Sequence, residues 1–176
     1  SDSLREILAT ITGTDMLVTI GGASVGHYDL VKTVLGEEGL DITFSRVAMR
    51  PGKPLILGKI NGIPMLGLPG NPVSAGVTAA LFLGPAISKM LGAENTAHVT
   101  ETAVLGLDLA ENDKRQDYIR ATLTIGGDGA LTATPFDRQD SSMLARFAEA
   151  DCLVIRAPFA EPIKAGERVE IIRLDG

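Results

Sequence analysis

Two segments of this sequence have the residue types of an anion-binding site, and the first is rich in glycine. Gly21-Gly22-Ala23-Ser24-Val25-Gly26 follows an apolar run of strand length and precedes a helical pattern. Glycines let the backbone bring its N–H groups close to an anion, and a helix N-terminus adds partial positive charge. Asp29 lies just beyond this segment. A carboxylate in this position either complements the helix dipole, or holds Mg²⁺ against a phosphate, or moves a proton during phosphate-ester cleavage. The segment is neither a dinucleotide fingerprint nor a Walker loop, so alone it is equally typical of a tight turn.

The second segment is the basic loop Arg50-Pro51-Gly52-Lys53-Pro54. Its prolines stiffen the backbone, which lowers the ordering cost of binding a small oxyanion. Arginine offers a planar fork of donors and lysine a point charge. The loop lies within residues 42–93, which contain no Asp or Glu. That stretch either keeps carboxylates away from an anion site or belongs to a core with few charges.

A third segment is Leu68-Pro69-Gly70-Asn71-Pro72-Val73-Ser74, which predicts a strand end, a corner and a helix start. Asn71 is a typical N-cap, and Pro72 suits the first helical turn. By itself this pattern indicates only a well-capped helix. Two glycine-containing helix starts with a basic loop between them favour a phosphorylated or oxyanionic small molecule as ligand.

Alternating helix and strand patterns must position these segments. They predict helices over residues 4–11 and 30–35, strands over 16–20 and 42–48, a hairpin of 55–60 and 63–68 around Asn61-Gly62, and a helix over 72–91. Such alternation is typical of a layered α/β sheet. Residues 92–98 read as a linker. Short strands follow over 103–109, 118–125, 131–134, 152–156 and 169–174, with a hairpin at 126–129 and a short helix within 141–150, which predicts a small barrel or sandwich.

Composition excludes several classes of function. The chain has 176 residues, a net charge of −6, no Trp and only 4% aromatic residues. Nucleic-acid binding is therefore not expected, because it needs basic surface and stacking side chains. We find no secretory start and no apolar run of about 18 residues, so we expect no membrane partner and a cytoplasmic location. The single Cys152 cannot form an internal disulfide and is expected in the core.

Taken together, the three segments resemble the molybdopterin molybdenumtransferase family, the bacterial MoeA proteins and the gephyrin E domain, in order and spacing over residues 2–92. Residues 96–176 are similar to that family's C-terminal β-domain in three further motifs, which are Arg115-Gln116-Asp117-Tyr118-Ile119-Arg120, Gln139-Asp140-Ser141-Ser142-Met143-Leu144 and Ala165-Gly166-Glu167-Arg168-Val169. The resemblance implies an α/β fold: a partial three-layer molybdopterin-binding domain over residues 1–94, followed by a small all-β barrel-like domain over residues 95–176.

The resemblance also implies a reaction. Family members insert molybdate into adenylylated molybdopterin and release AMP, with Mg²⁺ supporting the step. Asp29 is then the implied catalytic residue and magnesium ligand. The implied cofactor-binding residues are Gly21, Gly22, Ser24, Gly26, Pro69, Gly70, Asn71, Pro72 and Ser74. The implied molybdate-binding residues are Arg50, Lys53, Ser74, Arg115 and Ser141, although the family often carries Lys at the Arg50 position.

The sequence resembles only the C-terminal part of that family, whose members are much longer homodimers with sites built from both subunits. We expect an exposed sheet edge that pairs with another chain or a further segment. The resemblance implies a homodimer supplied by molybdopterin adenylyltransferase. Two alternatives stay open: a non-catalytic module that binds pterin or a partner, and an enzyme similar to the adenylyltransferase itself. The β-domain after Gly92 argues against the second, because the adenylyltransferase has a single domain.

Overall fold

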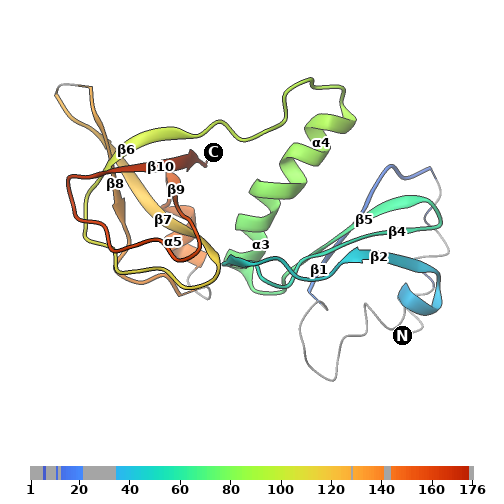
Figure 1. The fold of residues 1–176 in the computed structure, drawn as a ribbon. Helices are drawn as coiled ribbons and strands as arrows, with labels where there is room; N and C mark the ends of the chain where they lie inside the picture. The colour runs from blue at the N-terminus through green and yellow to red at the C-terminus, as the bar shows by residue number, and fades with distance from the viewer. Residues whose placement is uncertain are drawn as a thin grey trace. The chain divides into compact units, whose positions relative to one another are not determined.

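A computed structural model describes residues 6, 11, 13–21, 35–127, 129–140 and 144–174 of the chain (Figure 1). Backbone contacts divide the chain into two compact units. The first, the sheet unit, comprises residues 1–47 and 52–79, and the second, the barrel unit, comprises residues 48–51 and 80–176. The predicted domain division between residues 94 and 95 stays a prediction.

Within the described residues, the sheet unit contains a four-stranded mixed sheet in the order β1-β5-β4-β2. Its strands are β1 (Leu17–Ile20), β2 (Leu40–Phe44), β4 (Ile56–Ile60) and β5 (Ile63–Leu68). Strand β1 runs parallel to β5, whereas β4 is antiparallel to both β5 and β2. The predicted hairpin is confirmed, because Asn61 and Gly62 both have positive φ, at 50° and 82°, as a tight hairpin turn requires. Leu35, Ile56 and Met65 contribute to the apolar core of this unit.

The single strand expected over residues 42–48 is wrong in its extent. The structure has β2 ending at Phe44 and a separate short strand β3 (Met49–Arg50). Strand β2 pairs with β4 in the sheet unit, with an irregular register between Ile42 and Phe44. Strand β3 pairs instead with β7 of the barrel unit. The segment is divided because its two ends find ladder partners in different units, which local pattern does not reveal.

The helix expected after Asn71 is confirmed, and it is continuous from Pro72 to Met90. It consists of α3 (Pro72–Thr78), a π-helical turn η1 (Ala79–Leu83) and α4 (Gly84–Met90). The π turn ends two residues before Pro85, which has no N–H to donate to the Leu81 carbonyl one turn earlier. His98 Nε2 lies 3.2 Å from that carbonyl oxygen, so the imidazole N–H supplies a donor there.

By length and composition alone this helical segment could cross a membrane. Its first two turns, however, bury Val73 and Val77 completely. The core helix of a soluble protein passes the same test of length and composition. The absence of a membrane partner stays a prediction.

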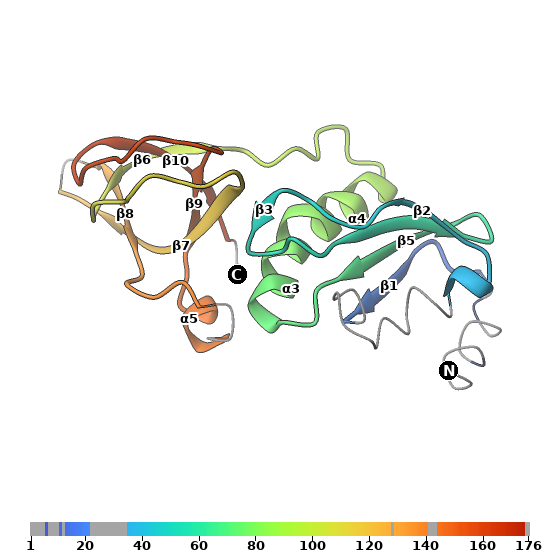
Figure 2. The ribbon, with the colours of Figure 1, turned by 60° about the horizontal axis from the view of Figure 1, so that its bottom comes forward.

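The barrel unit is a small closed barrel, as predicted (Figure 2). Its strands are β6 (Glu101–Leu105), β7 (Gln116–Ile125), β8 (Leu131–Pro135), β9 (Cys152–Arg156) and β10 (Arg168–Arg173). The order β7-β8-β6-β10-β9 closes because β9 also pairs with β7, while β3 adds to the β7 edge. Ala103, Ala121 and Ala133 fill its core with larger side chains such as Ile171, since a narrow barrel accommodates few bulky residues. The short helix α5 (Leu144–Ala148) lies within the predicted helical segment.

Candidate functional site

Two glycine corners meet at one edge of the mixed sheet. Parallel pairing aligns Ile20 of β1 with Leu68 of β5, so both strands end at the same level. The Gly21 N–H donates to the Leu68 carbonyl over 3.0 Å, and Gly21 has a φ of 86°. A Cβ on Gly70 would lie only 3.2 Å from the Gly21 Cα, so the backbones are in direct contact. Open α/β sheets bind their ligands at the carboxyl ends of parallel strands, which is where this corner lies.

Asn71 links the corner to the helix. Its Oδ1 accepts a hydrogen bond of 3.3 Å from the Ser74 N–H, which confirms the predicted cap. Its amide nitrogen has no hydrogen bond within the described part of the chain, so that donor is available to a ligand. Ser74 is itself buried, and its carbonyl accepts from Thr78 Oγ1 over 2.7 Å. Of the predicted cofactor-binding residues, the structure therefore brings Gly21 together with those in the segment 69–74.

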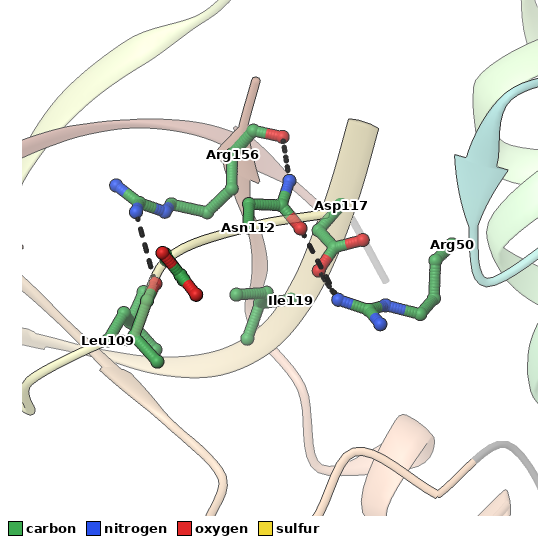
Figure 3. A pocket seen from close by; sticks show the side chains of 8 residues that line it. Arg50, Leu109, Asn112, Asp117, Ile119 and Arg156 are labelled. Atoms are coloured by element: carbon green, nitrogen blue, oxygen red, sulfur yellow. Dashed lines mark hydrogen bonds and ion pairs between the residues drawn. The ribbon is translucent and has the colours of Figure 1, made fainter. Parts of the chain in front are cut away.

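The barrel unit holds a row of three charged residues across adjacent strands (Figure 3). In register, Arg50 of β3 faces Asp117 of β7, and Asp117 faces Arg156 of β9. Asp117 is 6% exposed and accepts a hydrogen bond from Arg50 Nη2 through its Oδ2. Arg156 is also buried, and its Nη2 donates to the backbone carbonyls of three loop residues, Ala110, Ala160 and Glu161. The row borders a cavity of about 160 Å³, whose apolar wall includes Leu109 and Ile119.

Asp113 joins the two predicted molybdate-binding arginines of this unit. Its carboxylate accepts from Arg115 Nη2 over 2.7 Å and from Arg50 Nη1 over 3.5 Å. The hydrogen bonds from Arg115 lower the pKa of Asp113 from its usual 3.8 to about 2. The same ion pair raises the pKa of Arg115. Arg50 and Arg115 thus lie in a cluster with Asp113 and Asp117 whose formal charges cancel, so any anion there is bound by directed hydrogen bonds.

Asn112 organises the loop that carries these carboxylates, and the sequence analysis did not identify it. Its amide nitrogen donates to the carbonyls of Arg115, Arg156 and Ala157 at 2.8, 3.2 and 2.8 Å. Its Oδ1 accepts from the Asp113 N–H at 2.8 Å and from Arg50 Nη2 at 3.4 Å. The sequence indicated Arg50 and Arg115 as anion-binding residues and showed no carboxylate in residues 42–93. The carboxylates that compensate Arg50 come from a later segment.

Two motifs of the barrel unit meet at Arg120, which is 1% exposed. Gln139 Oε1 accepts from the Arg120 backbone N–H at 3.0 Å and from its Nε at 3.3 Å. Arg120 Nη1 donates to the Asp140 carbonyl at 3.2 Å, and burial lowers the pKa of this guanidinium. This buried cation was not among the predicted site residues, because isolated arginines are normally exposed.

The remaining predicted site residues divide into two groups. Lys53 and Ser74 belong to the sheet unit, where Lys53 is exposed and its carbonyl accepts from the Val47 N–H at 2.9 Å. The others lie outside the described residues: Gly22, Ser24, Gly26, Asp29 and Ser141. Within the described residues, no group of three or more His, Cys, Asp or Glu side chains could hold a metal ion.

Two family profiles match consecutive parts of the chain. One, described as a probable molybdopterin binding domain, matches residues 1–89, and the other, described as the MoeA C-terminal region (domain IV), matches residues 102–174. Two proteins named molybdopterin molybdenumtransferase, from Haemophilus influenzae and Bacillus subtilis, are each 32% identical to this chain, over 95% and 98% of its length. The chain spans 41% of the length of each of these relatives.

Solved structures agree with this match. A molybdopterin biosynthesis moeA protein from Pyrococcus horikosii has a TM-score of 0.78 at 30% identity, covering 99% of this chain and 41% of that one. The fold and the two profiles together define the class of protein: a probable molybdopterin binding domain is followed by a small closed barrel that matches the MoeA C-terminal region (domain IV). The chain belongs to the molybdopterin molybdenumtransferase (MoeA) family and corresponds to its C-terminal part.

Proposed function

We propose that this chain acts in molybdenum cofactor biosynthesis, in the step that inserts molybdate into adenylylated molybdopterin and releases AMP. The observation that carries the proposal is the contact between the Gly21 and Gly70 corners at the carboxyl ends of β1 and β5. A backbone corner without side chains suits the close approach of a phosphate or pyrophosphate group. The curated relatives that match nearly the whole chain carry the name of this enzyme.

Within this proposal the two units have separate tasks. The glycine corner and the Asn71 amide bind the pterin precursor, and Arg50 of the barrel unit donates hydrogen bonds to molybdate. Lys53, Ser74, Arg115 and Ser141 are proposed to assist in binding the oxyanion. We further propose a cytoplasmic homodimer that receives its substrate from molybdopterin adenylyltransferase.

Asp29 is proposed as the catalytic carboxylate and as the residue that holds Mg²⁺. Magnesium sites on phosphate substrates need only one or two protein carboxylates, because phosphate oxygens and water complete the shell. Asp29, three positions after the glycine-rich segment 21–26 in the sequence, would supply one such carboxylate. When bound, Mg²⁺ would neutralise the charge of the phosphates. Asp29 would orient the ion and hold or move a proton.

Calorimetric titration of adenylylated molybdopterin into the 176-residue chain, with molybdate and Mg²⁺ present, tests the proposal. The same samples are then assayed for AMP. Binding with AMP release supports the enzyme as stated, and Asp29→Asn should abolish the release while retaining binding. Binding without release favours the non-catalytic pterin-binding module. The proposal is wrong for this chain if neither binding nor release occurs in samples that the calorimeter shows to be folded.

A further inference from the structure

The Arg50 guanidinium is held in place while half of its side chain stays exposed. Arg50 Nη2 donates to Asp117 and Asn112, and Nη1 donates to Asp113. A guanidinium has five N–H groups. Within the described residues, the Nε–H and one Nη1–H therefore have no acceptor. The Arg50 side chain is 48% exposed, so a ligand can approach it from solvent.

Asp117 is the buried member of this set, because its side chain is only 8% exposed. The sheet register fixes it between Arg50 and Arg156, and its Oδ1 is buried without a hydrogen bond among the described residues. Asp113, in contrast, is 44% exposed and makes its shorter contacts with Arg115. The position of the Arg50 guanidinium thus depends mainly on Asp117.

We propose that Asp117 is a positioning residue for oxyanion binding. It holds Arg50 by Nη2, so that the free Nε–H donates to an oxygen of molybdate while the ion pair stays intact. The inference rests on the proposed function, from which it takes molybdate as the ligand. A flexible arginine loses considerable rotamer freedom on binding, and a fixed one has already lost it. Because the carboxylates cancel the charge of the cluster, geometry rather than net charge selects the anion.

The opposite possibility is that Asp117 competes with molybdate for Arg50, and two matched variants separate the alternatives. Asp117→Asn and Asp113→Asn each remove one negative charge beside Arg50, but only Asp117→Asn weakens the buried ion pair. Molybdate is titrated calorimetrically into the full chain and into both variants. Asp108→Asn serves as the remote control, because Asp108 pairs with Lys164 on the barrel surface. We expect Asp117→Asn to bind about 3- to 10-fold more weakly than Asp113→Asn. Equal or tighter binding by Asp117→Asn overturns the inference.

Nitrogen-15 NMR measures how fast the Arg50 guanidinium rotates. A purely structural role of Asp117 would not change this rate. We expect slow rotation about its Nε–Cζ bond in the wild-type chain and in Asp113→Asn, and faster rotation in Asp117→Asn. Molybdate should shift the Arg50 Nε–H signal while rotation stays slow. Rapid rotation on molybdate binding would mean that the ion pair breaks, which overturns the inference.

Because Asp117 is buried, Asp117→Asn could prevent folding. Arg50→Lys therefore provides a second test. It keeps the positive charge but removes the Nε–H donor, and it should weaken molybdate binding about 3- to 10-fold. Binding equal to wild type overturns the inference. Adenylylated molybdopterin is titrated in parallel without molybdate. If the wild-type chain binds adenylylated molybdopterin but not molybdate, only this inference is overturned. If it binds neither ligand, the proposed function is overturned as well.

Discussion

Gly21 and Gly70 are 49 positions apart in the sequence, yet a Cβ placed on Gly70 would lie 3.2 Å from the Gly21 Cα. The parallel register of β1 and β5 causes this approach, since it ends both strands at the same level. Gly21 begins the glycine-rich segment 21–26, and Gly70 lies within the segment 68–74. A substitution at this corner should therefore change both the stability of the sheet unit and its ligand binding.

Gly70→Ala should destabilise the sheet unit and weaken binding of adenylylated molybdopterin. The added methyl group meets backbone atoms of Gly21, which cannot move aside as a side chain could. We expect a loss of about 1–3 kcal/mol in the free energy of unfolding, measured by urea denaturation. Gly127→Ala is the control, because its added Cβ meets nothing within 4 Å. Equal effects of the two substitutions would contradict the proposed close approach.

His98→Ala should lower the free energy of unfolding by about 1 kcal/mol, because the Leu81 carbonyl loses the imidazole donor. The double-mutant cycle with Pro85→Ala is the sharper measurement. Alanine restores a backbone N–H one turn after Leu81, so His98→Ala should cost less in that background. Additive effects would show that the imidazole does not substitute for the missing N–H. Asn95→Ala removes the hydrogen bond from the Ala97 N–H in the same connecting segment, so it controls for the loss of a hydrogen bond that does not involve Leu81.

Asp113 should titrate near pH 2 when its carboxyl carbon is followed by NMR. Because its folded-state pKa lies below the usual 3.8, its contribution to stability is present above that value and is lost as the pH falls toward 2. Arg115→Ala removes the main cause of the shift, so the pKa should rise toward 3.8. An unchanged value in Arg115→Ala would mean that other groups hold the carboxylate.

Cys152 should react slowly with thiol reagents at neutral pH in the folded chain. Burial raises the pKa of its thiol to about 12, and the side chain is fully enclosed in the barrel core. The thiolate is the reactive form, so both its rarity and its burial protect it. Since the folded-state pKa lies above the usual 9.0, the associated stability is lost as the pH rises from there toward 12. Fast labelling of the folded chain, with a rate equal to that in urea, would disprove this burial.

Local sequence determined the features that depend on neighbouring residues. Asn61-Gly62 specified a hairpin because both positions must adopt positive φ, and Asn71 specified a helix start because its side chain reaches the Ser74 N–H. The strands of the barrel were predictable from short apolar runs separated by turns. The family could be predicted from the order of six motifs along the chain. Each motif is a run of adjacent residues, so it can be read without the fold.

Only the tertiary structure decided the partners of Arg50. The sequence places Arg50 beside Lys53 in a stretch without carboxylates, which indicates either an anion site or a core with few charges. The fold instead joins β3 to β7, which sets Arg50 opposite Asp117, a residue 67 positions later. Strand register is a long-range property: it depends on which strands pair and at which residue, and the charge pattern of one segment does not contain that information.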